Sequence, residues 1–114
     1  VTLQAAQQRG AQLNTVTPRD INMINSFKHK GLEEFFTKGT TRGIQADHVK
    51  KLRKILALLN TVGGPDGMRL PNYCLHQLQG QRIDTWSVKV NGNWRVTFRF
   101  DNGNAEIVNY EDYH

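Results

Sequence analysis

The sequence contains one cysteine, Cys74, and no apolar run of the length that a transmembrane helix needs. One cysteine excludes an internal disulfide and is typical of a reducing compartment, so we expect a cytoplasmic protein. The first residues carry no basic start followed by an apolar block, so we expect no secretory signal. The four histidines and the cysteine lack zinc-ligand spacing, and no phosphate loop, serine elbow or dinucleotide fingerprint is present. We therefore expect neither a metal nor a cofactor.

Acidic residues are also comparatively few. Fifteen lysines and arginines against ten aspartates and glutamates give a net charge of +5 at pH 7 and a pI near 9.7. Such an excess favours polyanionic partners, with nucleic acid first and an anionic membrane surface or an acidic protein next. A merely solvated basic surface is the alternative. The chain has 114 residues, of which 38% are hydrophobic and 22% charged, so it fits one globular domain.

The chain divides at Met23, which is a candidate natural start. Residues 1–22 are rich in glutamine and have no clear hydrophobic period, so we predict a flexible N-terminal extension. Residues 23–114 are predicted to form a single domain. Its first element is the short apolar stretch MINSF, residues 23–27, which we interpret as an opening strand.

Two helices are predicted in the first half of this domain. The stretch LEEFF, residues 32–36, has apolar residues at i, i+3 and i+4, and this helix is expected to end at Gly39. The second helix is predicted over residues 46–60, where one face is apolar and the rest is basic. Its apolar face consists of Val49, Leu52, Ile55, Leu56 and Leu59.

The second half of the domain has the alternating hydrophobicity of half-buried strands. The dipeptide Asn91-Gly92 and the later Asn102-Gly103 are hairpin signals, because both turn positions need positive φ. Strands are predicted at residues 74–78, 86–90, 94–100 and 105–110. The predicted fold class is α+β, with two N-terminal helices packed on a small antiparallel sheet.

The alternation places two arginines on the sheet face that turns away from the helices. Arg95 and Arg99 alternate with apolar residues and are separated by roughly 13 Å at about 3.3 Å per residue. Guanidinium groups form forked bonds with phosphate oxygens, so this face is a phosphate surface, with solvent-facing arginines as the alternative. His76 precedes it. RNA cleavage needs a base and an acid around the 2′-hydroxyl, and histidine suits both roles, but a strand histidine can equally be structural.

Four blocks occur in order along the chain: SFKHKGLEEFF, LHQLQGQR, WSVKVNGNWRVTFRF and VNYEDYH. They closely resemble the HigB branch of the RelE/ParE toxin superfamily, over residues 23–114. The resemblance implies a RelE-like, microbial-ribonuclease-like fold and the toxin of a type II toxin–antitoxin system. The implied activity is an endoribonuclease that cleaves mRNA at the A site of the translating ribosome. The implied partners are a HigA-like antitoxin, the 70S ribosome and mRNA; no membrane is implied, and the free toxin is expected to be monomeric.

The resemblance also assigns residues. The implied catalytic residues are His76, Arg95, Asp112, Tyr113 and His114. The expected RNA-binding residues are Gln79, Arg82, Arg99, Lys50, Lys51 and Lys54. For the three lysines the expectation rests on their positive charge, and a solubilising helix face is the alternative. One departure concerns Gln79, because HigB-like proteins commonly have a lysine there that helps to hold phosphate.

Two other functions compete with this interpretation. A ParE-type toxin has a similar scaffold but inhibits DNA gyrase and does not require His76 or His114. A catalytically weak module that binds only RNA or an antitoxin is the second alternative, and neutral Gln79 is its best support. Between His76 and His114, the sequence leaves open which is the acid and which the base.

Overall fold

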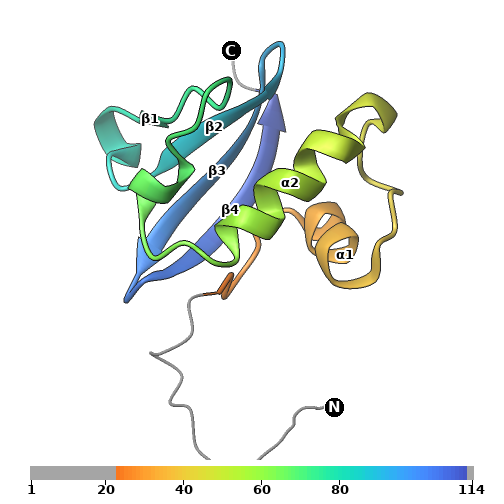
Figure 1. Cartoon of the computed structure of the whole chain (residues 1–114), viewed down its shortest axis with the longest axis horizontal. Coiled ribbons are helices and arrows are strands. Elements are labelled where there is room, and N and C mark those ends of the chain that lie inside the picture. Colours follow the sequence, from red (N-terminus) through yellow and green to blue (C-terminus); the bar gives the residue numbers. More distant parts are fainter. Residues whose placement is uncertain (1–22, 113–114) are drawn as a thin grey trace, which may run out of the picture.

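A computed structural model describes residues 23–112 of the chain (Figure 1). The predicted extension at 1–22 and the predicted site residues Tyr113 and His114 lie outside the described residues. The helices are α1 (Lys30–Lys38) and α2 (Val49–Leu59), and the strands are β1 (His76–Gln77), β2 (Trp86–Asn91), β3 (Trp94–Asp101) and β4 (Asn104–Asp112). Short 3-10 helices are η2 (Ala46–His48), η3 (Pro65–Met68) and η4 (Gly80–Arg82).

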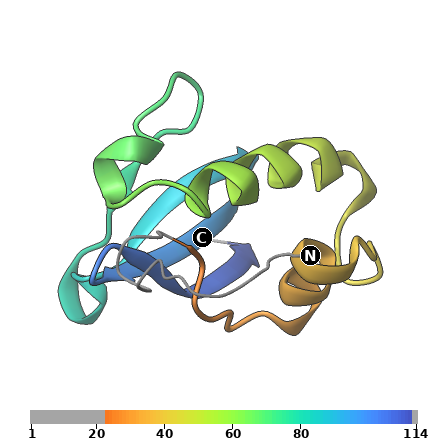
Figure 2. The same cartoon turned by 60° about the horizontal axis from the view of Figure 1, so that its bottom comes forward.

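Within residues 23–112 the strands form one antiparallel sheet in the order β1-β2-β3-β4. Helix α2 crosses one face of this sheet, and α1 lies beside it (Figure 2). The core lies between these layers, where Phe98, Val96 and Leu56 are buried. Burial of each such side chain stabilises the fold by about 1.5–3 kcal/mol. The predicted α+β class is therefore confirmed.

Helix α1 begins and ends where local chemistry requires it. The ring Nδ1 of His29 accepts a hydrogen bond of 2.9 Å from the backbone N–H of Leu32 and so caps the first turn. Gly39 ends the helix in the left-handed region at φ 77°, and its N–H donates to the carbonyl of Phe35 at 3.0 Å. Glycine adopts this conformation without steric cost. The helix ends at Gly39, so the predicted end is confirmed.

Helix α2 buries the predicted apolar face. Leu52, Ile55, Leu56 and Leu59 are buried, while Val49 is half-buried at the first turn. The predicted segment 46–60 begins as η2 and continues as α2.

The sequence located the turn of the second hairpin correctly and misplaced the turn of the first. Asn102 and Gly103 have φ of 52° and 82°, as predicted for a two-residue turn. The prediction for Asn91-Gly92 was wrong by one position, because Asn91 is the last residue of β2 and pairs with Trp94. A register irregularity between Lys89 and Asn91 moves the turn forward, so that Gly92, at φ 57°, is its first residue.

Of the predicted strands, one does not form and another is shorter than expected. Residues 23–27 form no strand, and Ile24 and Phe27 make only isolated parallel bridges to Ala105 and Val108 of β4. The strand predicted at 74–78 is reduced to the two residues of β1. Just before β1, Cys74 has a φ of 50°, and this left-handed conformation is incompatible with an extended strand.

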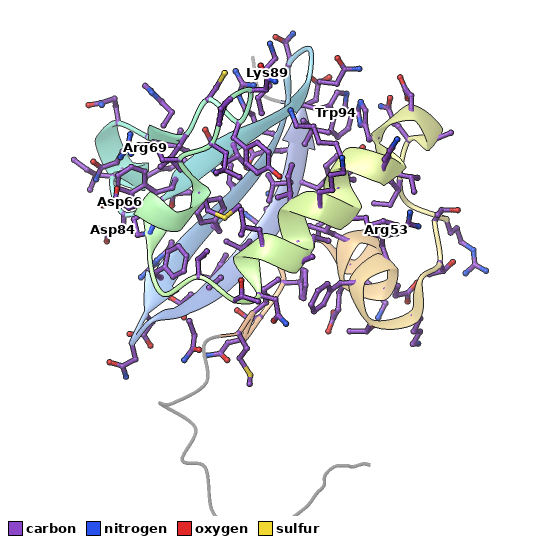
Figure 3. The ribbon with its side chains drawn as sticks, in the orientation of Figure 1. Arg53, Asp66, Arg69, Asp84, Lys89 and Trp94 are labelled. Carbon is purple, nitrogen blue, oxygen red and sulfur yellow. The ribbon has the colours of Figure 1, made fainter. Side chains whose placement is uncertain are left out.

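A buried polar pair ties the end of β4 to the start of α2. The hydroxyl of Tyr110 lies 2.6 Å from Nδ1 of His48, and these residues are 4% and 3% exposed. Trp94 packs against Tyr110 with ring centroids 4.6 Å apart, at the end of the sheet near α2 (Figure 3). Burial raises the pKa of the Tyr110 hydroxyl, which therefore keeps its proton at neutral pH.

Replacing Tyr110 by phenylalanine is expected to lower the free energy of unfolding by about 1–3 kcal/mol, because the buried His48 nitrogen loses its partner. Urea denaturation followed by circular dichroism measures this loss. The matched control is Tyr73→Phe, because Tyr73 is half-buried and its hydroxyl has no hydrogen bond within the described part of the chain. Equal losses in the two variants would contradict the role given to the His48–Tyr110 bond.

Candidate active site

Polar side chains from all strands share the face of the sheet that turns away from α2, which we call the open face. The strand register carries them across the sheet: His76 pairs with Ser87, Ser87 with Thr97, and Thr97 with Asn109. In the neighbouring row Lys89 pairs with Arg95, and Arg95 with Glu111. The open face consists of His76, Ser87, Lys89, Arg95, Thr97, Arg99, Glu106, Asn109 and Glu111. The predicted sharing of one face by the two arginines of β3 agrees with this register.

A cavity on the open face brings two predicted catalytic residues together. It has a volume of about 290 Å³ and is lined by Cys74, His76, Ser87 and Arg95. Nη1 of Arg95 is shielded from solvent and has no hydrogen-bond partner among residues 23–112. Arg95 therefore has an unsatisfied guanidinium N–H and also lines a cavity, and such a side chain is suited to bind an anionic oxygen, because buried polar groups are normally satisfied. We call this cavity the His76–Arg95 cavity.

A second cavity of the open face lies towards Arg99. It has a volume of about 170 Å³, and its lining includes Lys28, Arg82, Thr97, Arg99 and Asn109. Nε of Arg99 lies 3.6 Å from a carboxylate oxygen of Glu106, which is within ion-pair range but too long for a hydrogen bond. The lining contains three cationic side chains, of which Arg82 and Arg99 pair with Glu111 and Glu106, so the cavity keeps a net positive charge that suits an anion.

Arg82 reaches over the sheet from η4 and pairs with Glu111. Its Nη2 and Nη1 donate to the two carboxylate oxygens of Glu111 at 2.8 and 3.3 Å. Thr97 and Asn109 donate to the same carboxylate at 2.9 and 3.3 Å. The hydrogen bond from Arg82 is the largest cause that lowers the pKa of Glu111, which is therefore ionised at neutral pH. Arg82, expected to bind RNA, is thus engaged by a carboxylate in the RNA-free protein.

The three predicted lysines of α2 line a cavity other than the His76–Arg95 cavity, although Lys51 is near enough to Cys74 and Arg95 to interact with them electrostatically. Lys50, Lys51 and Lys54 line a separate cavity of about 460 Å³ together with Tyr73. Nζ of Lys51 donates to the carbonyl of Asn72 at 3.0 Å and lies 5.5 Å from the centre of the Tyr73 ring. Burial lowers the pKa of Lys51. Lys51 therefore fastens the loop that leads into β1.

Two further predicted residues lie at the margins of the open face. Gln79 is exposed and directly precedes Gly80, the first residue of η4, which has a φ of 69°. Asp112 is exposed at the end of β4, where it pairs with Trp94, one position beyond the Arg95–Glu111 pair. Tyr113 and His114 follow Asp112 in the chain and lie outside the described residues.

Sequence reasoning assigned no role to several residues of the open face and its cavities, among them Ser87, Thr97, Glu111 and Cys74. Ser87 and Thr97 alternate with buried residues on β2 and β3, so their strand period already placed them beside Arg95. Glu111 is one of two acids that close β4, and nothing in the pattern distinguished it from Asp112. Cys74 lines the His76–Arg95 cavity through an irregular loop that carries no periodic signal.

No helix in the described range is long and apolar enough to span a membrane. Likewise, no three His, Cys, Asp or Glu side chains of residues 23–112 are grouped as ligands for a metal ion.

The two-layer fold and the arginines of the open face agree with a small toxin of the RelE type. The family model described as the RelE-like toxin of the type II toxin–antitoxin system HigB matches residues 25–114, and the chain belongs to this family. A similar curated protein is Endoribonuclease HigB of Proteus vulgaris, which is 47% identical over 92 residues. The alignment covers 81% of this chain and 100% of that relative. As a type II toxin, the protein has an antitoxin as its partner.

Proposed function

We propose that this toxin is an endoribonuclease that cleaves mRNA at the A site of the translating ribosome and thereby inhibits translation. The observation that carries the proposal is that Arg95 and His76 line one cavity, while Nη1 of Arg95 has no hydrogen-bond partner among residues 23–112. The similarity to Endoribonuclease HigB supports the same activity. The protein acts in the cytoplasm, where ribosomes are, and the free toxin is a monomer that binds a HigA-like antitoxin.

The proposed chemistry uses the nucleophile that RNA already carries. A base removes the proton of the 2′-hydroxyl, the 2′-oxygen attacks phosphorus, and the 5′-oxygen leaves with a proton from an acid. The products are a 2′,3′-cyclic phosphate and a free 5′-hydroxyl, and no metal is needed. The guanidinium of Arg95 stabilises the charge that develops on the phosphate oxygens. His76 and His114 supply the base and the acid, in either order.

The remaining predicted residues support this step. Asp112 orients a neighbouring group or closes the site at the end of β4. Tyr113 stacks on a base or transfers a proton. Lys50 and Lys54 of α2 are exposed and contact ribosomal RNA phosphates without reading sequence. Arg99, with Lys28 beside it in the second cavity, binds a phosphate of the mRNA.

The test is cleavage of a defined mRNA by purified protein in the presence and absence of programmed 70S ribosomes, mapped by primer extension. Cuts that need ribosomes and fall in the A-site codon support the proposal. If the folded protein makes no cuts in either reaction, the proposal is contradicted, and gyrase inhibition or a binding role replaces it. A supercoiling assay with DNA gyrase separates those two outcomes.

Replacing Gln79 by lysine is expected to raise the single-turnover cleavage rate by about three- to tenfold, because it adds a cation near the phosphate. Rates are measured on programmed ribosomes at saturating protein. The matched control is Gln81→Lys, an exposed neighbour in η4 that adds the same charge two residues away. An unchanged rate, or an equal gain from Gln81→Lys, would show that position 79 has no specific role.

A further inference from the structure

The carboxylate of Glu111 lies in a cradle of hydrogen-bond donors on the open face, near the end of the edge strand β4. Arg82 donates two hydrogen bonds to it, and Thr97 and Asn109 donate one each. The four bonds come from three separate elements: η4, β3 and β4 itself. A surface ion pair needs only its two partners, so the additional hydroxyl and amide donors mark this position as a site built for an anion.

The cradle has the features of a phosphate-binding site. The forked geometry of Arg82 is the one by which guanidinium binds both carboxylate and phosphate. Lys28, Arg82 and Arg99 line the adjoining cavity, and their ion-pair partners among residues 23–112 are Glu106 and Glu111, so a phosphate finds an excess of positive charge there. The Glu111 side chain is 23% exposed, so it has a route out to solvent.

The cradle is also correctly placed relative to the proposed site of cleavage. Glu111 is the register partner of Arg95 on the neighbouring strand. Thr97 follows Arg95 on the same face of β3 at a distance of about 6.6 Å along the strand. A nucleotide can span such a step, so a phosphate bound in the cradle and one bound at Arg95 can belong to neighbouring nucleotides of one RNA strand.

We propose that Glu111 occupies, in the RNA-free toxin, a phosphate subsite beside Arg95, and that a phosphate of the bound RNA displaces it. Arg82 then transfers its fork from the carboxylate to the phosphate, and Thr97 and Asn109 donate to the phosphate oxygens in turn. This inference rests on the proposed binding of RNA to the open face. The carboxylate of Glu111 then competes with an RNA phosphate for the same hydrogen-bond donors, and this competition weakens RNA binding.

The test uses a single-stranded oligoribonucleotide in which every 2′-hydroxyl is methylated, so that it cannot be cleaved. Its affinity is measured by fluorescence anisotropy over a series of salt concentrations. The variants are Glu111→Gln, Arg82→Gln and the double variant of these two. The matched control is Asp66→Asn, which also removes one negative charge but breaks the exposed Asp66–Arg69 pair near η3, outside both cavities of the open face (Figure 3).

Glu111→Gln is expected to bind the oligonucleotide about three- to fivefold more tightly than the wild type, because no ion pair must break. Arg82→Gln is expected to weaken binding and to reduce the slope of log K against log salt by about 0.7, the value of one single-strand phosphate contact. The double variant is expected to lose the gain made by Glu111→Gln. Asp66→Asn should stay close to the wild type.

Affinity of Glu111→Gln that is equal to or weaker than that of Asp66→Asn would overturn the inference and leave Arg82–Glu111 as a structural pair. If Glu111→Gln fails to fold, Arg82→Gln decides, and an unchanged salt slope in that variant overturns the inference. Tighter binding by Glu111→Gln without mRNA cleavage by the wild type would overturn only the proposed function. Cleavage without any oligonucleotide binding would overturn only the subsite.

Discussion

Replacing Arg95 by glutamine is expected to reduce ribosome-dependent mRNA cleavage by about 100- to 1,000-fold. Arg95 lines the His76–Arg95 cavity, and its Nη1 has no hydrogen-bond partner among the described residues, so the guanidinium can bind a phosphate of the RNA. Glutamine fills similar space but supplies neither the positive charge nor the fork that stabilises developing phosphate charge. The measurement is the single-turnover rate on programmed ribosomes.

Two further variants show whether the effect is local. Arg69→Gln also removes one positive charge, but Arg69 pairs with Asp66 on an exposed turn, so its rate should match the wild type. Arg95→Lys keeps the charge and loses the fork, so an intermediate rate is expected. A similar loss in Arg69→Gln and Arg95→Gln would mean that net charge, and not the position of Arg95, controls the reaction.

Truncating His76 to alanine is expected to lower the cleavage rate by at least about 100-fold, and added imidazole should restore part of it. His76 is exposed on β1 and lines the same cavity as Arg95, so removal of its ring leaves room for a free imidazole. Restoration by imidazole is the decisive readout, because a purely structural histidine would not be replaced in this way. Rates are compared across imidazole concentrations at constant pH and ionic strength.

The control for His76 is Cys74→Ser, a nearly isosteric change in a side chain that lines the same cavity. It keeps the wall of the cavity and should cleave at the wild-type rate. If His76→Ala cleaves as fast as Cys74→Ser, His76 has no part in proton transfer, and the acid–base work falls to His114 and its neighbours.

Local signals in the sequence predicted the elements that depend on local physics. Gly39 ends α1 because glycine alone enters the left-handed region without steric cost, and Asn102-Gly103 forms its turn for a related reason. The buried face of α2 follows from the helical period. The turn near Gly92 was misplaced by one residue because a register irregularity in the paired strand is a property of two strands together.

The candidate site was predictable only in part. Strand alternation placed Arg95 and Arg99 on one face, and the open face of the structure agrees. The engagement of Arg82 was not predictable, because its partner Glu111 is 29 residues away in the sequence and is reached across β3. The lysines of α2 were expected to bind ribosomal RNA, and the structure places them around a different cavity from His76, where Lys51 holds the loop before β1.

The sequence by itself determined the α+β class, the two faces of the sheet and membership of the HigB-like toxin family. These features follow from hydrophobic period, turn residues and ordered sequence blocks, which are all encoded along the chain. Tertiary structure alone decided which polar groups meet. The packing of distant elements places the guanidinium of Arg95 beside His76 in one cavity. It also brings hydrogen-bond donors to the carboxylate of Glu111. Such contacts depend on three-dimensional register, and a linear pattern does not specify it.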